Sequence, residues 1–188
     1  MPKWEYATVP LLVHATKQIL DNWGDDGWEL VAVIPGPNSE QLATLGLTLP
    51  PVTAPVAAYV PAVRTGAYVY VSGQLPVVDG KLPATGKVGD AVSAQDAAGL
   101  ARTCALNALA AAAEAAGGLD AIRRIVKVVG FVASAPGFSG QPQVINGASE
   151  LFIEVFGEAG RHARSAIGVA ELPLGAPVEV ELIAEVRD

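Results

Sequence analysis

The sequence predicts an α+β protein in which a mixed β-sheet carries two main helices on one face. Residues 178–186 alternate between apolar and mostly acidic side chains, which is the period of a β-strand with one buried face. Helical segments are expected at residues 94–116 and 144–156, each after a strand-like segment. A strand–helix–strand rhythm therefore occurs twice, over residues 56–116 and 125–186, and this favours two halves of one sheet.

The C-terminal strand keeps its polar groups on one side. A second strand is expected over residues 165–169, and the Leu-Pro-Leu-Gly-Ala-Pro connection suggests that the two strands form an antiparallel pair. The alternation assigns two sets of residues to opposite faces: Val178, Val180, Leu182, Ala184 and Val186 to the core, and Glu179, Glu181, Ile183 and Glu185 to the other face.

The expected pairing would bring a fixed cation, Arg164, close to Glu179. A guanidinium group binds a carboxylate through two parallel hydrogen bonds, and a nearby Glu can transfer a proton. The simpler interpretation is an ordinary cross-strand ion pair, which is common and weak. From these residues alone, the ordinary pair is favoured over a catalytic one.

The longest helix is expected to run from Ala94 to Ala116. Ser93 is a favoured N-cap, and Gly117 with Gly118 ends the helix. Alanine is the best helix former and permits close packing on a sheet. Cys104, the one cysteine in the chain, lies on the apolar stripe of this helix and is expected to be a buried structural thiol.

Other elements follow from short patterns. The apolar run at residues 125–134 predicts a central strand. Residues 56–63 and 67–72 are expected to form a hairpin that turns at residues 64–66, and Asp79-Gly80 is a strong turn dipeptide. A short helical turn is expected at residues 119–124.

The N-terminal segment, residues 1–36, is expected to be a separate small β-α-β unit. Its strands are expected at residues 4–9 and 28–34, and its helix at 11–22. Its Trp-Glu-Tyr opening and Gly-Trp-Glu-Leu-Val close resemble a small bacterial domain family of unknown function. The main domain is expected over residues 56–188.

Residues 37–55 are expected to be a linker rich in Pro and Gly. It contains a short helix over residues 40–45, for which Asn38 or Ser39 would be the N-cap.

Composition narrows the function classes. The chain has 188 residues, of which 51% are hydrophobic and 16% charged, so a folded domain with a sizeable core is expected. The net charge of −7 argues against nucleic-acid binding, which normally uses a basic surface. With one cysteine, no apolar run of membrane-spanning length and no signal-peptide pattern, a soluble cytoplasmic protein is expected.

Two motifs together resemble one known family. The segment from Ala163 to Pro173, with the Val-Glu-Val-Glu-Leu-Ile-Ala segment after it, is similar to the C-terminal signature of the RidA (YjgF/YER057c) family of reactive-intermediate deaminases. The Ala-Tyr-Val-Pro-Ala-Val segment at residues 58–63 and the Ser-Gly-Gln-Leu-Pro segment at 72–76 resemble its N-terminal strands. The resemblance covers roughly residues 50–188.

The resemblance implies a chorismate-mutase-like fold, assembled as a homotrimer with sites in the clefts between subunits. Such proteins hydrolyse 2-imino and enamine acids to 2-keto acids and ammonia. The partner expected here is a small-molecule carboxylate. No metal-ligand cluster, phosphate loop or flavin motif is evident, so neither a metal nor a cofactor is expected.

The resemblance also implies roles for individual residues. By position, Arg164 would bind the substrate carboxylate and Glu179 would activate water. Ala166 stands where the deaminases usually have cysteine, which changes the floor of the pocket. The remaining candidates are Tyr59, which would line the pocket, Gly73 with its neighbour Ser72, which would supply the backbone beside it, and the second-tier residues His162, Asn146 and Ser149.

Two other functions remain open. Ala166 and the extra N-terminal unit favour a non-catalytic trimeric protein that binds small carboxylates or regulates a partner. Some relatives have been called endoribonucleases, and for this chain the acidic charge balance argues against that activity.

Overall fold

The computed structural model describes residues 16–30, 36–52 and 58–187. The chain divides into two compact units, residues 1–34 and residues 35–188. None of the described helices is long and apolar enough to cross a membrane.

The described part of the first unit contains one helix, α1 (Thr16–Asp25). The rings of Trp23, in the last turn of α1, and Trp28, just after the helix, meet edge to face with their centroids 5.3 Å apart. Residues 28–30 form no strand, contrary to the expectation for residues 28–34, and residues 31–34 lie outside the described part. The strand expected at residues 4–9 and the first half of the expected helix also lie outside it.

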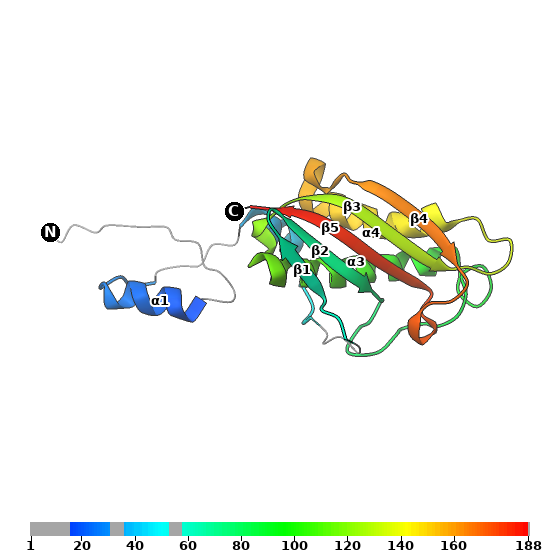
Figure 1. Cartoon of the computed structure of the whole chain (residues 1–188), viewed down its shortest axis with the longest axis horizontal. Coiled ribbons are helices and arrows are strands. Elements are labelled where there is room, and N and C mark those ends of the chain that lie inside the picture. The colour runs from blue at the N-terminus through cyan, green and yellow to red at the C-terminus, as the bar shows by residue number, and fades with distance from the viewer. Residues whose placement is uncertain (1–15, 31–35, 53–57, 188) are drawn as a thin grey trace. The chain divides into compact units, whose positions relative to one another are not determined.

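The described residues of the second unit form a mixed five-stranded sheet (Figure 1). In chain order its strands are β1 (Ala62–Thr65), β2 (Tyr68–Gln74), β3 (Ile122–Ala133), β4 (Ala163–Val169) and β5 (Val178–Val186). Their spatial order is β1-β2-β5-β3-β4. The β3–β4 pair is parallel and all other pairs are antiparallel. The predicted α+β class with a mixed sheet is therefore confirmed.

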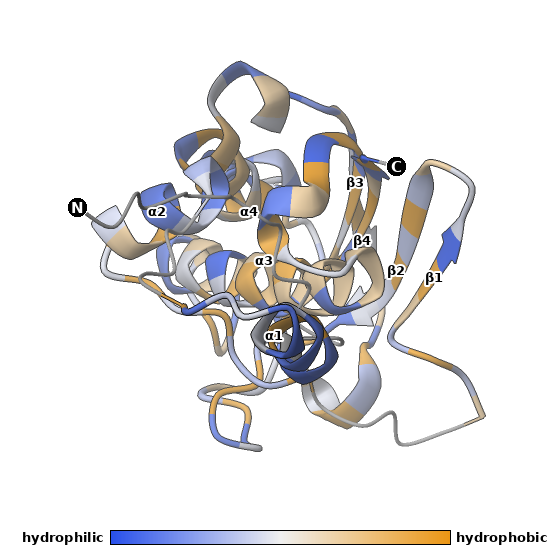
Figure 2. Cartoon of the chain, turned by 90° about the vertical axis from the view of Figure 1, so that its left-hand side faces the viewer, coloured by the Kyte–Doolittle hydropathy of each residue, from blue (hydrophilic) through white to orange (hydrophobic). Residues whose placement is uncertain are grey.

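The two main helices, α3 (Ala94–Ala116) and α4 (Gln141–Phe156), cover one face of the sheet (Figure 2). The predicted boundaries of α3 are confirmed: Ser93 accepts a hydrogen bond from the Asp96 amide, and Gly117 ends the helix in the left-handed conformation. The small side chains of α3 allow it to pack closely on β5 and β2. Among the described residues of the second unit, no helix covers the opposite face of the sheet, which is called the open face below.

The register of β5 follows the predicted alternation. Its five apolar side chains from Val178 to Val186 are buried under the helices, whereas those of Glu179, Glu181, Ile183 and Glu185 are half-buried on the open face. A turn at Asp79-Gly80 is also confirmed, since both residues have positive φ and Val78 pairs with Lys81.

The short helix α2 (Pro37–Thr44) packs on α4 and on a 3₁₀ turn at Leu119–Ala121, within the second unit. The expected capping by Asn38 or Ser39 is wrong. Instead the Asp120 carboxylate accepts hydrogen bonds from the amides of Asn38 and Ser39, at 2.8 and 3.1 Å, and from the Ser39 hydroxyl. Asp120, which is distant in the sequence, therefore caps the N-terminus of α2 in place of a local residue.

Candidate active site

The expected antiparallel hairpin between residues 165–169 and 178–186 does not form. Strand β4 pairs in parallel with β3, and β3 separates it from β5. The physical reason is the helix α4 between β3 and β4, because a helical crossover sets the strands on either side of it parallel. These two strands are also neighbours, whereas β2 and β3, which flank α3, have β5 between them. The connection after β4 instead crosses the end of β3 before β5 begins.

Arg164 lies near the start of the edge strand β4 and points to the helix-covered side of the sheet. Its Nη1 donates to Asn146 Oδ1 at 2.8 Å and to Ser149 Oγ at 3.1 Å, both on α4. Both partners are neutral. Among residues 16–30, 36–52 and 58–187, no carboxylate forms an ion pair with Arg164. The guanidinium is thus anchored without having its charge neutralised.

His162 is joined to Arg164 through Ser149. The hydroxyl of Ser149 lies 3.0 Å from His162 Nε2, and His162 Nδ1 lies 2.6 Å from the Gly160 carbonyl oxygen. Burial lowers the pKa of the imidazole below its usual value. The hydrogen bond to Gly160 opposes this shift and the charge of Arg164 adds to it. The lowered pKa therefore favours the neutral form of His162 at pH 7.

Glu179 lies on the open face, on β5. Its carboxylate rests against the backbone of Gly73, at the irregular end of β2, and a Cβ on that glycine would overlap Glu179 Oε1. Burial raises the pKa of the Glu179 carboxyl, and the neighbouring Glu181 raises it further. A carboxyl group with a raised pKa is suited to proton transfer near neutral pH.

Tyr59 lies in the segment that runs beside this end of β2. Ser72 fixes the segment in place: its amide donates to the Pro61 carbonyl at 2.9 Å and its hydroxyl to the Val60 carbonyl at 2.7 Å. Tyr59 is 48% exposed. The structure thus brings Ser72, Gly73 and Glu179 together and places the segment that carries Tyr59 beside Ser72; these four predicted residues are here called the Glu179 cluster.

A second group, the Arg164 cluster, contains Arg164, Asn146, Ser149 and His162. In the sheet, Arg164 is opposite Val128 and Glu179 is opposite Phe131, which is three residues further along β3. The Cα atoms of Arg164 and Glu179 are therefore separated by two strand spacings across the sheet and by three residues along the strands. Together these offsets correspond to about 14 Å. Because the offset is an odd number of residues, the side chains also point to opposite faces.

Ala166 lies on the helix-covered face, opposite Gly130, and its methyl group packs against the hydrophobic core. It belongs to the Arg164 side of the sheet, since it is two residues further along the same strand.

A shallow groove of about 470 Å³ lies on the open face, next to His162. Sequence reasoning did not single out most of its residues, since no motif connects them. It is lined by Tyr68, Arg124, Val126, Arg161, His162, Ala163 and Glu185. Within the described part of the chain, no three His, Cys, Asp and Glu side chains gather as metal ligands would.

Comparison with known proteins identifies the family. Residues 39–186 match the family model described as "YjgF/chorismate mutase-like, putative endoribonuclease". The match covers most of the chain and includes both clusters. The chain belongs to the YjgF/RidA family, as its motifs predicted. The match begins after the first compact unit.

Individual relatives agree with this assignment. Protein TCP17 of Trypanosoma cruzi is 43% identical over 157 residues, which cover 83% of this chain and 98% of TCP17. The crystal structure of Atu1372, a protein of unknown function from Agrobacterium tumefaciens, is 46% identical with a TM-score of 0.73, covering 81% of this chain and 94% of that one. The structure of E. coli TdcF with bound serine is 29% identical with a TM-score of 0.54, covering 73% of this chain and 94% of TdcF.

Proposed function

We propose that this protein hydrolyses reactive 2-imino and enamine acids to 2-keto acids and ammonia. One observation carries the proposal: the Arg164 guanidinium is held by two neutral side chains and has no carboxylate partner among the described residues. The remaining N–H donors of the guanidinium are therefore available to bind the carboxylate of a ligand. The bound serine in the TdcF relative is itself a small molecule with a carboxylate.

The chemistry assigned to the other residues follows from their surroundings. Glu179 accepts a proton from a water molecule, whose oxygen adds to the imine carbon while the imine nitrogen takes up a proton. The resulting carbinolamine loses ammonia, which leaves the 2-keto acid. The raised pKa of the Glu179 carboxyl favours this proton transfer. Tyr59 and the Gly73 backbone would shape the pocket around the reacting carbon, and the reaction needs no cofactor.

A single copy of the chain does not bring the two key side chains to one small substrate. Arg164 and Glu179 are about 14 Å apart and point to opposite faces of the sheet. Both can contact one 2-imino acid if Glu179 comes from a second copy. This supports a homotrimer with its sites between subunits. The open face offers exposed apolar side chains for such contacts: Tyr68, Tyr70 and Ile167.

A second candidate function is carboxylate binding without turnover. The observation that favours it is Ala166, which leaves an unreactive methyl group beside Arg164 on β4. Binding would need only the Arg164 cluster, whereas hydrolysis also needs Glu179. RNA cleavage, the activity in the family description, is a third possibility that the net charge of −7 disfavours.

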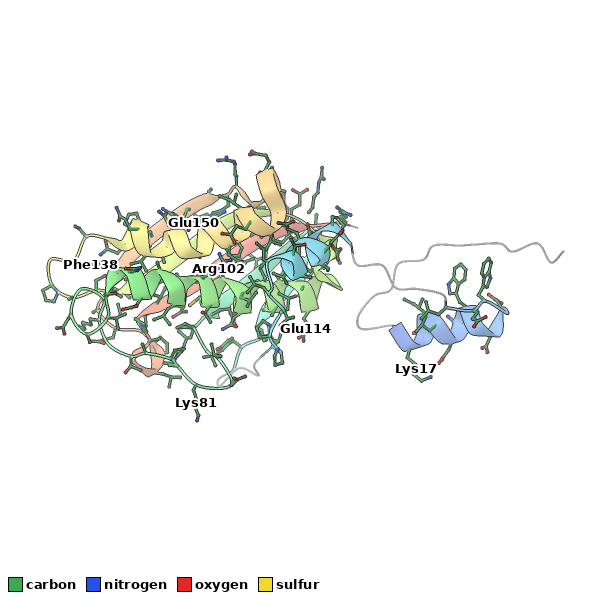
Figure 3. The ribbon with its side chains drawn as sticks, turned by 180° about the vertical axis from the view of Figure 1, so that it is seen from behind. Lys17, Lys81, Arg102, Glu114, Phe138 and Glu150 are labelled. Carbon is green, nitrogen blue, oxygen red and sulfur yellow. The ribbon has the colours of Figure 1, made fainter. Side chains whose placement is uncertain are left out.

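The deciding experiment is a coupled assay of imine hydrolysis. An amino-acid oxidase generates 2-imino acids, and semicarbazide traps those that escape hydrolysis. The full chain should accelerate release of the 2-keto acid, and Arg164→Ala should abolish the effect. Arg102→Ala is the matched control, because Arg102 lies on α3 and pairs with Glu154 at 2.6 Å (Figure 3).

The outcomes separate the three functions. Acceleration that survives Arg164→Ala would refute the mechanism. No acceleration, together with 2-keto acid binding that depends on Arg164, would favour the binding protein. RNA cleavage that persists through repeated purification and is lost in Arg164→Ala would favour the nuclease.

A further inference from the structure

Three side chains from separate parts of the fold form a continuous chain of hydrogen bonds. Arg164 comes from β4, Ser149 from the middle of α4, and His162 from the segment just before β4. The contacts run from Arg164 Nη1 to Ser149 Oγ at 3.1 Å, then to His162 Nε2 at 3.0 Å, and from His162 Nδ1 to the Gly160 carbonyl at 2.6 Å.

The partners fix where each proton lies. A carbonyl oxygen can only accept, so His162 Nδ1 carries the proton that it donates to Gly160. In a neutral imidazole Nε2 is then an acceptor, so the Ser149 hydroxyl donates its one proton to Nε2. The lone pairs of that hydroxyl remain for the guanidinium of Arg164, which can only donate. For neutral His162, this is the one arrangement that satisfies every partner.

His162, at the end of this series of hydrogen bonds, is held firmly in place. The His162 ring packs edge to face on the fully buried Phe152, with centroids 5.7 Å apart. Gly160 is itself buried, and a Cβ there would overlap the Phe152 carbonyl. The imidazole is therefore held on its Nδ1 side by the backbone and packed against Phe152 of the core.

We infer that His162 is a positioning residue that acts through Ser149 to hold the Arg164 guanidinium in the orientation needed for a substrate carboxylate. The role assigned to that carboxylate rests on the proposed function. The hydrogen-bond chain itself does not, so the two can fail separately.

The first test compares two amide variants. Gln at position 162 can place an acceptor where Nε2 lies, whereas Asn is shorter and cannot reach Ser149. Pyruvate binding to the full chain, measured by calorimetry, should weaken about five- to tenfold in His162→Asn and in Ser149→Ala, since each loses one neutral hydrogen-bond anchor. His162→Gln should bind pyruvate nearly as well as the wild type. Glu150→Gln, on the same helix as Ser149 (Figure 3), is the control.

The double variant Ser149→Ala/His162→Asn should bind no more weakly than either single variant, because the two residues act in series. Additive losses, or binding by His162→Asn that equals the wild type, would overturn the inference. Circular dichroism and thermal unfolding of each variant exclude loss of the fold as the cause.

A second test needs no ligand. In ¹⁵N-labelled protein at pH 7, His162 should carry its proton on Nδ1, and rotation of the Arg164 guanidinium should be slow in the wild type and faster in Ser149→Ala. A proton on Nε2, or equal rotation in both proteins, would overturn the inference. If these signals behave as expected while the wild type binds no pyruvate, the inference stands and the proposed function fails.

Discussion

The separation of Arg164 from Glu179 within one chain makes a quantitative prediction about mixed oligomers. Arg164→Ala and Glu179→Gln should each be inactive alone. If every site combines Arg164 of one copy with Glu179 of the next, a mixture of the two variants regains intact sites. In an equal mixture, each position holds either variant with a probability of about one half, so about one quarter of the sites are intact. Imine hydrolysis should recover to about one quarter of the wild-type rate.

The assay requires exchange of subunits. The two variants would be co-refolded in equal amounts and tested for imine hydrolysis with the oxidase and semicarbazide. A control mixture of Arg164→Ala with the double variant Arg164→Ala/Glu179→Gln cannot form an intact site and should stay inactive. A site within one copy gives no recovery in the first mixture. That result would refute the inference drawn from the 14 Å separation, which is about three times the length of a small 2-imino acid.

Three further predictions concern single residues. Gly73→Ala should reduce turnover more than tenfold, because its methyl group would displace the Glu179 carboxylate; Gly99→Ala, with open space around it on α3, should keep full activity. Asp120→Ala should lower the free energy of unfolding in urea by about 1–2 kcal/mol, since α2 loses its cap, and an unchanged value would contradict that role. Burial lowers the pKa of His162, so below pH 6.5 the unfolded chain binds more protons than the folded one. The free energy of unfolding should therefore decrease as the pH is lowered in this range. His162→Gln should remove this part of the pH dependence, as urea midpoints at pH 7 and pH 5.5 would show.

The residue pattern predicts which face of a strand is buried more reliably than it predicts the strand's neighbour. The alternation over residues 178–186 gave the bounds of β5 and the direction of each side chain, because burial of one face imposes a period of two. The alternation contains no information about whether β3 or β4 lies alongside. The proximity of residues 165–169 in the sequence suggested β4, whereas the helix between β3 and β4 sets those two strands parallel, and in this sheet they are neighbours.

Long-range hydrogen bonds were also beyond sequence reasoning. The amides at the start of α2 have a local candidate acceptor in Ser39, yet Asp120, more than eighty residues away, accepts from them. Any acceptor with the right position satisfies an amide, so a local motif alone does not determine the cap. By contrast Ser93 and Gly117, which act within their own helix, were predicted correctly at both ends of α3.

In the candidate site too, the sequence predicted local features and missed the long-range arrangement. Family motifs pointed to Tyr59, Ser72, Gly73, Arg164 and Glu179 one by one, because each motif lies within a single strand and its neighbours. Asn146, Ser149 and His162 were candidates because the resemblance places their helix and loop beside the pocket. The motifs did not reveal that the sheet separates Arg164 from Glu179, since that depends on the order of strands. The separation has a chemical consequence. A cation and a carboxylate in direct contact would neutralise each other, whereas keeping them on opposite faces leaves Arg164 for a ligand and Glu179 with a raised pKa. Under the proposed function, assembly of several copies would bring both charges to the same substrate, so the proposed homotrimer would be part of the catalytic machinery.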